Sequence, residues 1–403
     1  MAQRIHLVAA ARPNFMKVAP LWHALAAAPD FTPVLIHTGQ HYDVNMSDAF
    51  FSDLRLPEPD HHLGVGSGSH AEQTGGVMIQ YENVALNDRP NWLVVVGDVN
   101  STAACAMVAA KIGFPVIHLE AGLRSRDRAM PEEVNRLVTD VLADVLWTPS
   151  PDADENLAAE GVAASRITRV GNIMLDSFEL VRPAIEAADL PAELGLKRGG
   201  YGVVTLHRPS NVDEPAQLIR LVDALIEVQR DLPLVFPVHP RTAARLKQNG
   251  IDTRLLRAGV KLIEPQPYVR FMSLVTGAAA AITDSGGVQE ETTYLGIPCL
   301  TLRDSTERPI TVTEGTNRLV TPETLLIELT KAISTPRAVR PCPEFWDGAT
   351  AARCLADLRR RSSGPALLPS AKQSPAELTA ELARRYGGDE RRVSGLASYR
   401  RSS

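Results

Sequence analysis

Apolar and polar residues alternate between two patterns along most of the chain. Short, continuous apolar runs end in glycine or a polar residue, and stretches with helical spacing of apolar positions follow them. In the first half, strands are expected at residues 5–10, 33–37, 92–96, 115–119 and 145–148, and helices near residues 16–28, 71–85, 102–111 and 132–142. In the second half, strands are expected at residues 202–206, 234–238, 261–263, 279–282 and 299–302, and helices near residues 215–230, 268–276, 288–295 and 323–333.

This alternation predicts an α/β protein with two domains. Apolar strands that alternate with helices are typical of parallel sheets covered by helices on both faces. A chain of 403 residues also exceeds the size at which a single core stops growing. We predict a first domain at residues 1–185 and a second at residues 186–347, with the inter-domain region at residues 187–200.

The end of the chain has a different composition. From about residue 359, arginine, serine, glycine and proline dominate, apart from one amphipathic stretch at residues 375–385. We therefore expect a flexible tail at residues 359–403. A basic tail can bind nucleic acid, but a solvated terminus is the more common case.

Composition narrows the class of protein. A net charge of −5 gives no electrostatic reason to expect nucleic acid or an anionic membrane as partner. The four cysteines lie far apart without a CxxC pair, which suits reduced thiols in a cytosol. The first residues read as a strand instead of a signal peptide, and the longest apolar runs are too short to span a bilayer. We expect a cytoplasmic protein.

Charged and polar residues follow the predicted strands at their carboxyl ends, where parallel α/β sheets bind ligands. In the first half these residues are Arg12, Lys17, Asp98, Glu120 and Arg124, and in the second half they are His207, Arg208, Asp284, Ser285, Arg303, Glu307 and Arg308. Carboxylates on one side, with cations and a glycine pair on the other, indicate an anionic ligand that bridges the domains.

The segment Asp284-Ser-Gly-Gly-Val-Gln-Glu-Glu291 carries the most chemical information. Gly286 and Gly287 let the backbone approach a ligand closely, and the free N–H groups of the helix that they open favour a diphosphate. Ser285 adds a hydroxyl donor, and Glu291 lies one turn further on, where a carboxylate can accept from a ribose diol. A strand-to-helix turn that binds nothing is the alternative, because a lone glycine motif is weak evidence.

Other motifs have an ordinary structural interpretation. Pro131 followed by Glu132 is typical of helix initiation, and Glu132 with Arg136 can be a surface pair at i,i+4. His207 can be a core histidine that only satisfies hydrogen bonds. The run Gly64-Val-Gly-Ser-Gly-Ser69 misses the dinucleotide fingerprint, no Walker A motif exists, and the pair His61-His62 lacks metal-ligand spacing. We expect neither a cofactor nor a metal.

Ten motifs in order resemble the non-hydrolysing UDP-N-acetylglucosamine 2-epimerases. In the first half they are Ala11-Arg-Pro-Asn-Phe-Met-Lys17, Thr38-Gly-Gln-His-Tyr-Asp43, Gly97-Asp98, His118-Leu-Glu-Ala-Gly-Leu-Arg124, Pro131-Glu-Glu-Val-Asn-Arg136 and Gly171-Asn172. In the second half they are His207-Arg208, the segment from Asp284 to Glu291, Thr306-Glu-Arg-Pro309 and Glu314-Gly-Thr316, with a final Trp346-Asp-Gly348. The resemblance covers about residues 3–360 and implies two Rossmann-like domains that face each other across a cleft, as in the glycosyltransferase-B architecture.

The resemblance also implies roles at matching positions. Asp98, Glu120 and Glu132 match the family's catalytic carboxylates, and His207 matches its active-site histidine. Arg12, Lys17 and Arg308 match cationic substrate contacts, Ser285, Gly286 and Gly287 match the diphosphate loop, and Glu291 matches the ribose contact. A closing helix at residues 348–358 is expected to pack back on the first domain. A homodimer is the family expectation, and Gln40, His41 and the loop at residues 67–74 lie where a second UDP-N-acetylglucosamine can bind as an activator.

The implied reaction converts UDP-N-acetylglucosamine to UDP-N-acetylmannosamine. The C2 proton has no neighbouring carbonyl to acidify it, whereas UDP at C1 is a good leaving group when its charge is stabilised. Elimination to a 2-acetamidoglucal and re-addition of UDP therefore needs no redox cofactor. It needs acid and base groups on both faces of the ring and cations at the diphosphate. The mannosamine product would serve synthesis of surface polysaccharides.

Departures from the family keep alternatives open. Ala10 stands where the family usually has glycine, and Asn14 and Ser210 stand where many relatives have an acid. These differences put the substrate in question, so a related enzyme acting on another UDP-N-acetylamino sugar, such as a 2,3-diacetamido uronic acid, remains an alternative. A hydrolysing epimerase and a catalytically silent UDP-sugar-binding protein are two further ones.

Overall fold

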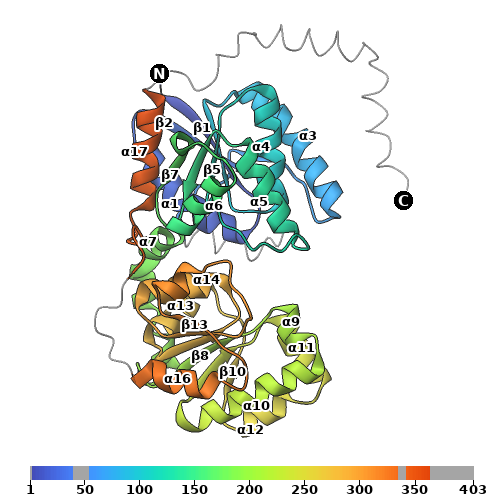
Figure 1. Cartoon of the computed structure of the whole chain (residues 1–403), viewed down its shortest axis with the longest axis vertical. Helices are drawn as coiled ribbons and strands as arrows, with labels where there is room; N and C mark the ends of the chain where they lie inside the picture. The colour runs from blue at the N-terminus through green and yellow to red at the C-terminus, as the bar shows by residue number, and fades with distance from the viewer. Residues whose placement is uncertain (1, 40–53, 335–341, 364–403) are drawn as a thin grey trace.

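The computed structural model describes residues 2–39, 54–334 and 342–363, which form two α/β domains along the long axis of the molecule (Figure 1). Each domain has one sheet in which all strand pairs are parallel. The α/β class predicted from the hydrophobic pattern is therefore confirmed.

The strands divide between two sheets. The first sheet has the order β3-β2-β1-β4-β5-β6-β7 and contains β1 (Gln3–Ala9), β2 (Phe31–His37), β3 (His61–His62), β4 (Trp92–Val96), β5 (Val116–Leu119), β6 (Val145–Thr148) and β7 (Ile167–Arg169). The second has the order β10-β9-β8-β11-β12-β13 and contains β8 (Gly202–Thr205), β9 (Leu234–Pro237), β10 (Lys261–Ile263), β11 (Ala280–Thr283), β12 (Cys299–Thr301) and β13 (Asn317–Leu319). In each sheet the order reverses next to the first strand, which is where such sheets bind ligands.

Helices connect successive strands. Those between β1 and β8 are α1 (Arg12–Ala26), α3 (His70–Asp88), α4 (Asn100–Ile112), α5 (Pro131–Leu142), α6 (Pro151–Ala159), a 3-10 turn (Ala164–Arg166), α7 (Ile173–Ala187) and α8 (Leu190–Glu193). Those after β8 are α9 (Pro209–Val212), α10 (Pro215–Asp231), α11 (Pro240–Gln248), α12 (Asp252–Arg257), α13 (Tyr268–Gly277), α14 (Gly286–Leu295), α15 (Ile310–Thr313), α16 (Leu325–Ser334) and α17 (Thr350–Ser362).

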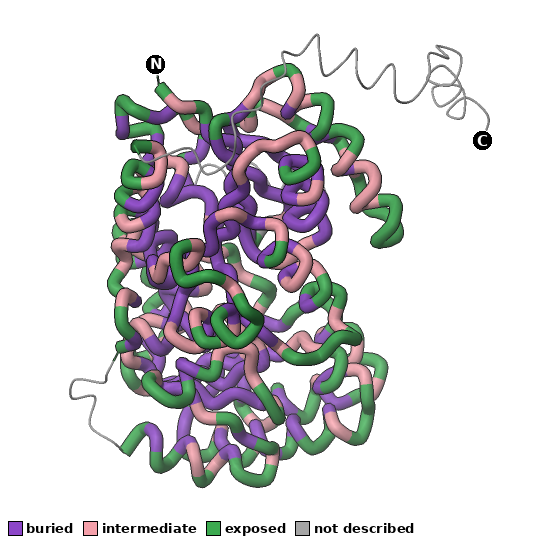
Figure 2. Tube along the Cα trace, turned by 45° about the horizontal axis from the view of Figure 1, so that its top comes forward, coloured by how far each residue is buried: buried purple, intermediate pink, exposed green. Residues whose placement is uncertain are grey.

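Strand residues of β1 alternate between the two faces of the first sheet. Ile5, Leu7 and Ala9 pack in a core with α1, α7 and α17, whereas Val8 packs in a second core with α3 and α4. Both faces are apolar because helices cover both, as the continuous apolar runs predict. Figure 2 shows the buried residues in purple toward the interior and exposed residues in green at the periphery.

Helix α17 returns to the first domain at the end of the described chain. Its Asp357 accepts a hydrogen bond of 2.8 Å from the indole Nε1 of Trp147 on β6, and its Arg359 pairs with Asp30 at 2.7 Å. The predicted closing helix at residues 348–358 thus runs from Thr350 to Ser362. Residues 359–362 are helical, which corrects the prediction that the tail begins at residue 359; residues 364–403 lie outside the described residues.

Other differences from the sequence prediction concern short elements. Strands β3, β7 and β13 were not predicted, because each contains at most one apolar residue and gives no apolar run. Helix α3 begins at His70, so the loop predicted at residues 67–74 ends at Ser69, whose hydroxyl caps the helix by accepting from the backbone N–H of Glu72 at 3.3 Å.

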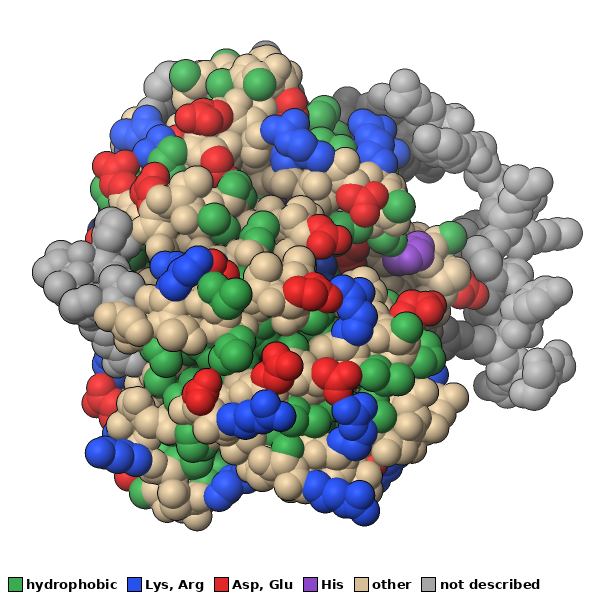
Figure 3. Space-filling view, turned by 60° about the horizontal axis from the view of Figure 1, so that its bottom comes forward, with side chains coloured by type: hydrophobic (Ala, Val, Ile, Leu, Met, Phe, Trp, Pro, Cys, Tyr) green, Lys and Arg blue, Asp and Glu red, His purple; other side chains and the backbone are tan. Residues whose placement is uncertain are grey.

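The face of the molecule drawn in Figure 3 shows no dominant charge. Figure 3 shows basic and acidic side chains interspersed on the face that it draws, in line with the small net charge. Among the described residues, no helix is long and apolar enough to cross a membrane. Neither do these residues include a group of three or more histidine, cysteine or acidic side chains that could hold a metal.

Candidate active site

Gly97 makes the turn at the carboxyl end of β4. Its φ is +67°, a conformation that glycine adopts without steric cost. A Cβ atom added there would lie 3.3 Å from the Nζ of Lys17 and 3.4 Å from the Oε2 of Glu120. Glycine therefore lets the backbone come close to the charged groups that meet at this end of the sheet.

Asp98 follows this turn and is held from helix α5. Its carboxylate pairs with the guanidinium of Arg136, and its backbone carbonyl accepts from the Nδ2 of Asn135 at 3.0 Å. The side chain of Asp98 remains 32% exposed. The carboxylate is thus held in place and is still partly accessible to a ligand.

Glu120 lies in the turn that follows β5. Its φ is +73°, a left-handed conformation that costs a non-glycine residue about 1–3 kcal/mol, and its backbone N–H donates to the carbonyl of Trp147 at 3.0 Å. One carboxylate oxygen pairs with Lys17 of α1, and the other lies 3.3 Å from the Nη2 of Arg308 in the second domain. Groups from both domains therefore converge on Glu120.

The two cations decide the ionisation of Glu120. Burial by itself would raise the pKa of this carboxyl, but Lys17 and Arg308 together hold the pKa below its usual range. Glu120 is consequently a carboxylate at neutral pH. Such a group can act as a base once a ligand draws a cation away from it.

Arg308 is positioned by the helix that follows the glycine pair. Its Nε donates to the Oε1 of Glu290 at 2.6 Å, and its Nη1 is buried without a hydrogen-bond partner among the described residues. The surrounding carboxylates raise the pKa of Arg308 against the effect of burial, and burial raises the pKa of Glu290 despite Arg308. A buried guanidinium with a free N–H can donate to an anion.

His207 follows β8, and its ring contacts Asp284, which follows β11. The ring Nδ1 lies 2.8 Å from Oδ1 of Asp284, and Oδ2 of this fully buried carboxylate accepts from the backbone N–H of Arg208 at 2.9 Å. Burial opposes ionisation of Asp284, but His207 and these backbone donors lower its pKa. The His207 side chain is 41% exposed, which rules out the interpretation as a core histidine.

Gly286 and Gly287 begin helix α14 without a conformational need for glycine. Neither has a positive φ; an added Cβ would lie 3.7 Å from the Oε1 of Glu307 at Gly286 and would meet nothing within 4 Å at Gly287. Glycine costs a helix about 0.5–1 kcal/mol relative to alanine. Because the fold does not require these glycines, they indicate a ligand that approaches the helix N-terminus closely.

Glu291 lies one turn into the same helix, buried against α13. Its Oε1 accepts a hydrogen bond of 2.8 Å from the hydroxyl of Tyr268. Burial raises its pKa to about 8. Below that pH the group is a neutral carboxylic acid that can donate as well as accept hydrogen bonds.

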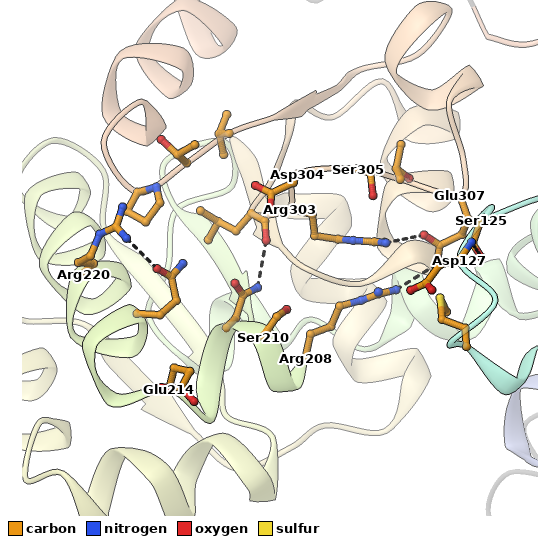
Figure 4. Close-up of a pocket in the computed structure, with 18 residues that line it drawn as sticks. Ser125, Asp127, Arg208, Ser210, Glu214, Arg220, Arg303, Asp304, Ser305 and Glu307 are labelled. Carbon is orange, nitrogen blue, oxygen red and sulfur yellow. Dashed lines mark hydrogen bonds and ion pairs between the residues drawn. The ribbon is translucent and has the colours of Figure 1, made fainter.

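Two cavities adjoin these residues. The smaller, of about 220 Å³, lies at the carboxyl ends of β8 to β10 and is lined by Thr205, Leu206, His207, Pro237, His239, Pro265, Gln266, Phe271, Ser285 and Val288. The larger, of about 600 Å³, lies between the loop after β5 and the second domain. Figure 4 shows Ser125 and Asp127 of the first domain beside Glu307 at one end of it, and Glu214 and Arg220 toward the other.

Three comparisons with known proteins bear on this arrangement. A family model described as UDP-N-acetylglucosamine 2-epimerase matches residues 23–359. The UDP-N-acetylglucosamine 2-epimerase of Methanocaldococcus jannaschii is 41% identical over 323 residues, 79% of this chain and 88% of its own. The chain belongs to the UDP-N-acetylglucosamine 2-epimerase family. Enzymes with this activity are isomerases, as the sequence predicted.

Another relative in this family has a different substrate in its name. The UDP-2,3-diacetamido-2,3-dideoxy-D-glucuronate 2-epimerase of Pseudomonas aeruginosa is 36% identical over 357 residues, which cover 88% of this chain and 98% of that enzyme. Membership of the family therefore fixes the class of reaction more firmly than the sugar.

Solved structures of family members share the two-domain fold. The Methanocaldococcus jannaschii enzyme in complex with UDP-GlcNAc and UDP aligns with a TM-score of 0.77 at 38% identity, over 88% of this chain and 99% of that one. The Neisseria meningitidis enzyme bound to UDP-GlcNAc gives 0.79 at 27% identity, over 89% and 100% of the chains. The predicted glycosyltransferase-B architecture is confirmed.

The structure does not place every predicted site residue in contact with the other residues of the candidate site. Glu132 is exposed on the first turn of α5, and the described residues offer it no hydrogen bond or ion pair. The predicted i,i+4 pair of Glu132 with Arg136 is wrong, because Arg136 binds Glu133 at 3.0 Å and Asp98 instead. Arg12 begins α1, but its side chain lies outside what the structure describes, as do Gln40 and His41.

Sequence reasoning missed several residues of the site. Glu290 holds Arg308, while Glu133 accepts from the backbone N–H groups of Ser125 and Arg126 at 2.9 Å each and so shapes the loop before α5. Both stand beside a residue that the motifs singled out. Their spacing alone gave no sign of which neighbour points inward.

Proposed function

We propose that this enzyme interconverts UDP-N-acetylglucosamine and UDP-N-acetylmannosamine without net hydrolysis, by elimination of UDP and re-addition through a 2-acetamidoglucal. The observation that carries the proposal is the convergence of Lys17 and Arg308, from different domains, on Glu120. A base and two cations in one cleft are what departure of a diphosphate and loss of a neighbouring proton require.

The glycine pair supports a diphosphate in the cleft. Ser285, Gly286 and Gly287 present the N-terminus of α14, and Arg308 lies against the same helix through Glu290. We assign the diphosphate to this place, with Lys17, Arg12 and Arg308 as cations and His207 beside it. Its negative charge would replace Glu120 as the partner of Arg308 and leave Glu120 free to accept a proton.

The uridine fits the second domain. The cavity of about 220 Å³ has the flat apolar side chains of Pro237, Pro265 and Phe271 and the amide of Gln266, a combination that suits a pyrimidine ring with hydrogen-bonding edges. We assign the ribose to Glu291, whose carboxyl group suits a diol.

Acid and base groups are needed on both faces of C2. Asp98 and Glu120 lie at the ends of neighbouring strands, and the resemblance adds Glu132. Because Glu132 is exposed and unpaired within the described residues, we propose that it joins the site when the domains close on substrate. Closure would also keep water away from the glycal.

A second candidate substrate is a UDP-2,3-diacetamido uronic acid. It is favoured by the 36% identity to the Pseudomonas aeruginosa enzyme, which this chain covers almost completely. The same elimination chemistry applies, because the leaving group and the C2 proton are the same. The additional carboxylate and acetamido group would have to be accommodated next to the first domain.

Proton NMR of each UDP-sugar with the enzyme in deuterated water distinguishes these possibilities. Formation of UDP-N-acetylmannosamine with deuterium at C2 would support the proposal, and conversion of only the uronic acid would favour the second candidate. Free N-acetylmannosamine with UDP would show a hydrolysing enzyme, and binding of UDP without turnover of either sugar would show a silent binding protein.

A matched pair of variants ties the reaction to the cleft. Glu120→Gln should lower kcat by about 10²-fold or more, the usual contribution of an acid–base group. Glu328→Gln, on α16, changes a carboxylate whose partners are Arg318 and Lys331 and should leave kcat unchanged. Equal activity of the two variants would contradict the role of Glu120.

Two partners inferred from the resemblance belong to the same proposal. A second UDP-N-acetylglucosamine as activator predicts sigmoidal substrate dependence. A homodimer is favoured by α5, which turns polar residues inward and leaves Val134 and Val141 47% and 75% exposed, and by Ile79 on α3, which is 62% exposed. We retain a cytoplasmic location as a prediction.

A further inference from the structure

His118 is a fully buried residue of β5 that lies between the two turns bearing Asp98 and Glu120. Its Nε2 is 2.8 Å from the backbone carbonyl oxygen of Gly97. Its Nδ1 is 2.6 Å from Oδ1 of Asp140 on α5. A carbonyl oxygen and a carboxylate can only accept hydrogen bonds, so both contacts require a proton on the ring nitrogen.

Asp140 continues the network to the second turn. Its Oδ2 accepts from the backbone N–H of Gly122 at 3.1 Å and pairs with the Nη1 of Arg124 at 2.7 Å. Arg124 in turn binds Glu160 with two hydrogen bonds of 2.8 and 2.6 Å. With a doubly protonated His118, two cations face two carboxylates, of which Asp140 is buried and Glu160 is 41% exposed, so the charges of the network balance.

The turns on either side need such support. Gly97 and Gly122 have φ of +67° and +82°, and Glu120 has φ of +73° without being glycine. A Cβ at Gly122 would lie 2.5 Å from the carbonyl oxygen of Ala153, so a larger residue would clash with this backbone. Strained conformations persist at functional sites only where the surrounding structure over-determines them.

We propose that His118 is a buried imidazolium and that, together with Asp140, it is a positioning pair that places Asp98 and Glu120 by fixing the Gly97 carbonyl and the Gly122 N–H. Its effect on the reaction rests on the proposed function. Neither residue is assigned a contact with the substrate. They act through the backbone of the two turns, as outer groups orient the ligands of a metal site.

The protonation state is tested first on the unaltered enzyme. ¹⁵N-histidine labelling and NMR at pH 8 should show one histidine with both ring nitrogens protonated, and His118→Gln should remove that signal. A neutral ring at His118 would overturn the proposal. This measurement uses no substrate, so it is independent of the proposed function, and the spectrum of the unaltered enzyme alone shows whether a doubly protonated histidine exists at pH 8.

The positioning role is tested with Asp140→Asn. The amide removes the negative charge, so His118 should become neutral, kcat for the UDP-sugar should fall about 10–100-fold, and KM should change less than about 3-fold. A purely structural role would lower the melting temperature and leave kcat of the folded fraction unchanged, which would overturn the proposal. Affinity for UDP should persist, because the residues assigned to it lie mainly in the second domain.

Asp88→Asn is the matched control. Asp88 also binds a buried histidine, with 3.1 Å between its Oδ2 and the Nε2 of His6, but His6 lies on β1 before its carboxyl end and away from both turns. The kcat of the Asp88→Asn variant should stay within about 2-fold of that of the unaltered enzyme. If the unaltered enzyme turns over neither UDP-sugar, the proposed function fails, while the NMR measurement still decides the state of the pair.

Discussion

Replacing Arg308 by methionine should destabilise the second domain in a manner that depends on pH. Arg308 and Glu290 are 14% and 3% exposed and 2.6 Å apart, so they form a buried pair. Methionine retains much of the apolar stem and removes the charge. The buried carboxylate of Glu290 then loses the only guanidinium that it pairs with among the described residues.

The magnitude follows from the cost of leaving one member of a buried pair alone, about 3–5 kcal/mol. For a domain of this size, each kcal/mol lowers the melting temperature by about 2–4 °C. A loss of about 3 kcal/mol at pH 8 therefore lowers the melting transition by about 6–12 °C. Arg220→Met is the control, since its partner Glu323 is 58% exposed and such surface pairs contribute about 1 kcal/mol or less.

The sign of the pH dependence is fixed by Glu290. Its pKa in the folded protein is raised by burial above the ordinary value of 4.5, and loss of Arg308 raises it further. Ionisation then favours the unfolded chain as the pH rises above 4.5, so stability is lost on going from pH 5 toward the folded-state pKa. The Arg308→Met variant should accordingly lose more stability at pH 8 than at pH 5.

Scanning calorimetry at the two pH values, with the Arg308→Met/Glu290→Gln double variant, tests this reasoning. The double variant has no buried carboxylate at position 290 and should recover part of the loss at pH 8. Equal losses at pH 5 and pH 8, or a double variant as unstable as the sum of its single changes, would refute the idea that an unpaired Glu290 is the cause.

Three further predictions follow from individual side chains. Because the pKa of Glu291 is about 8 in the fold, Glu291→Gln should gain stability over the unaltered enzyme as the pH rises from 4.5 to 8 and level off above it, whereas a pH-independent difference in melting temperature would exclude burial as the cause. Gly287→Ala should stabilise the unliganded protein by about 0.5–1 kcal/mol and weaken UDP binding at least 10-fold by calorimetry; unchanged UDP affinity would argue against close approach of the diphosphate. Val134→Asp with Val141→Asp should give a monomer by light scattering if the α5 face joins two copies, and a monomeric unaltered enzyme would contradict the dimer.

Local pattern accounts for much of what the sequence revealed. The apolar runs that became β1, β4, β5, β8 and β11 were evident because helices on both faces bury most side chains of such strands. The carboxyl ends of these strands then gave Asp98, Glu120, His207 and Ser285 as candidates, and the order of motifs gave the family. Strands β3, β7 and β13 contain at most one apolar residue each and left no such pattern.

The sequence pattern could not decide which of two adjacent acidic residues points into the site. Successive helical positions differ by about 100° in direction, so a shift of one residue decides which of Glu132 and Glu133 points inward. In the fold Glu133 is buried against Arg136, and Glu132 is exposed. The sequence motif contains both glutamates and does not indicate which of them is buried.

Contacts between distant parts of the chain were decided only by the tertiary structure. Arg308 reaches Glu120 over a separation of 188 residues, because the two domains face each other and not because of any local spacing. The same holds for Asp140 on α5. Only the tertiary structure brings its carboxylate to the backbone N–H of Gly122 and, through His118, to the carbonyl of Gly97. The sequence by itself determined the elements, the strand-end chemistry and the family. The packing of the sheets and domains decided which charges meet, because electrostatic pairing depends on distance in space and not on distance along the chain.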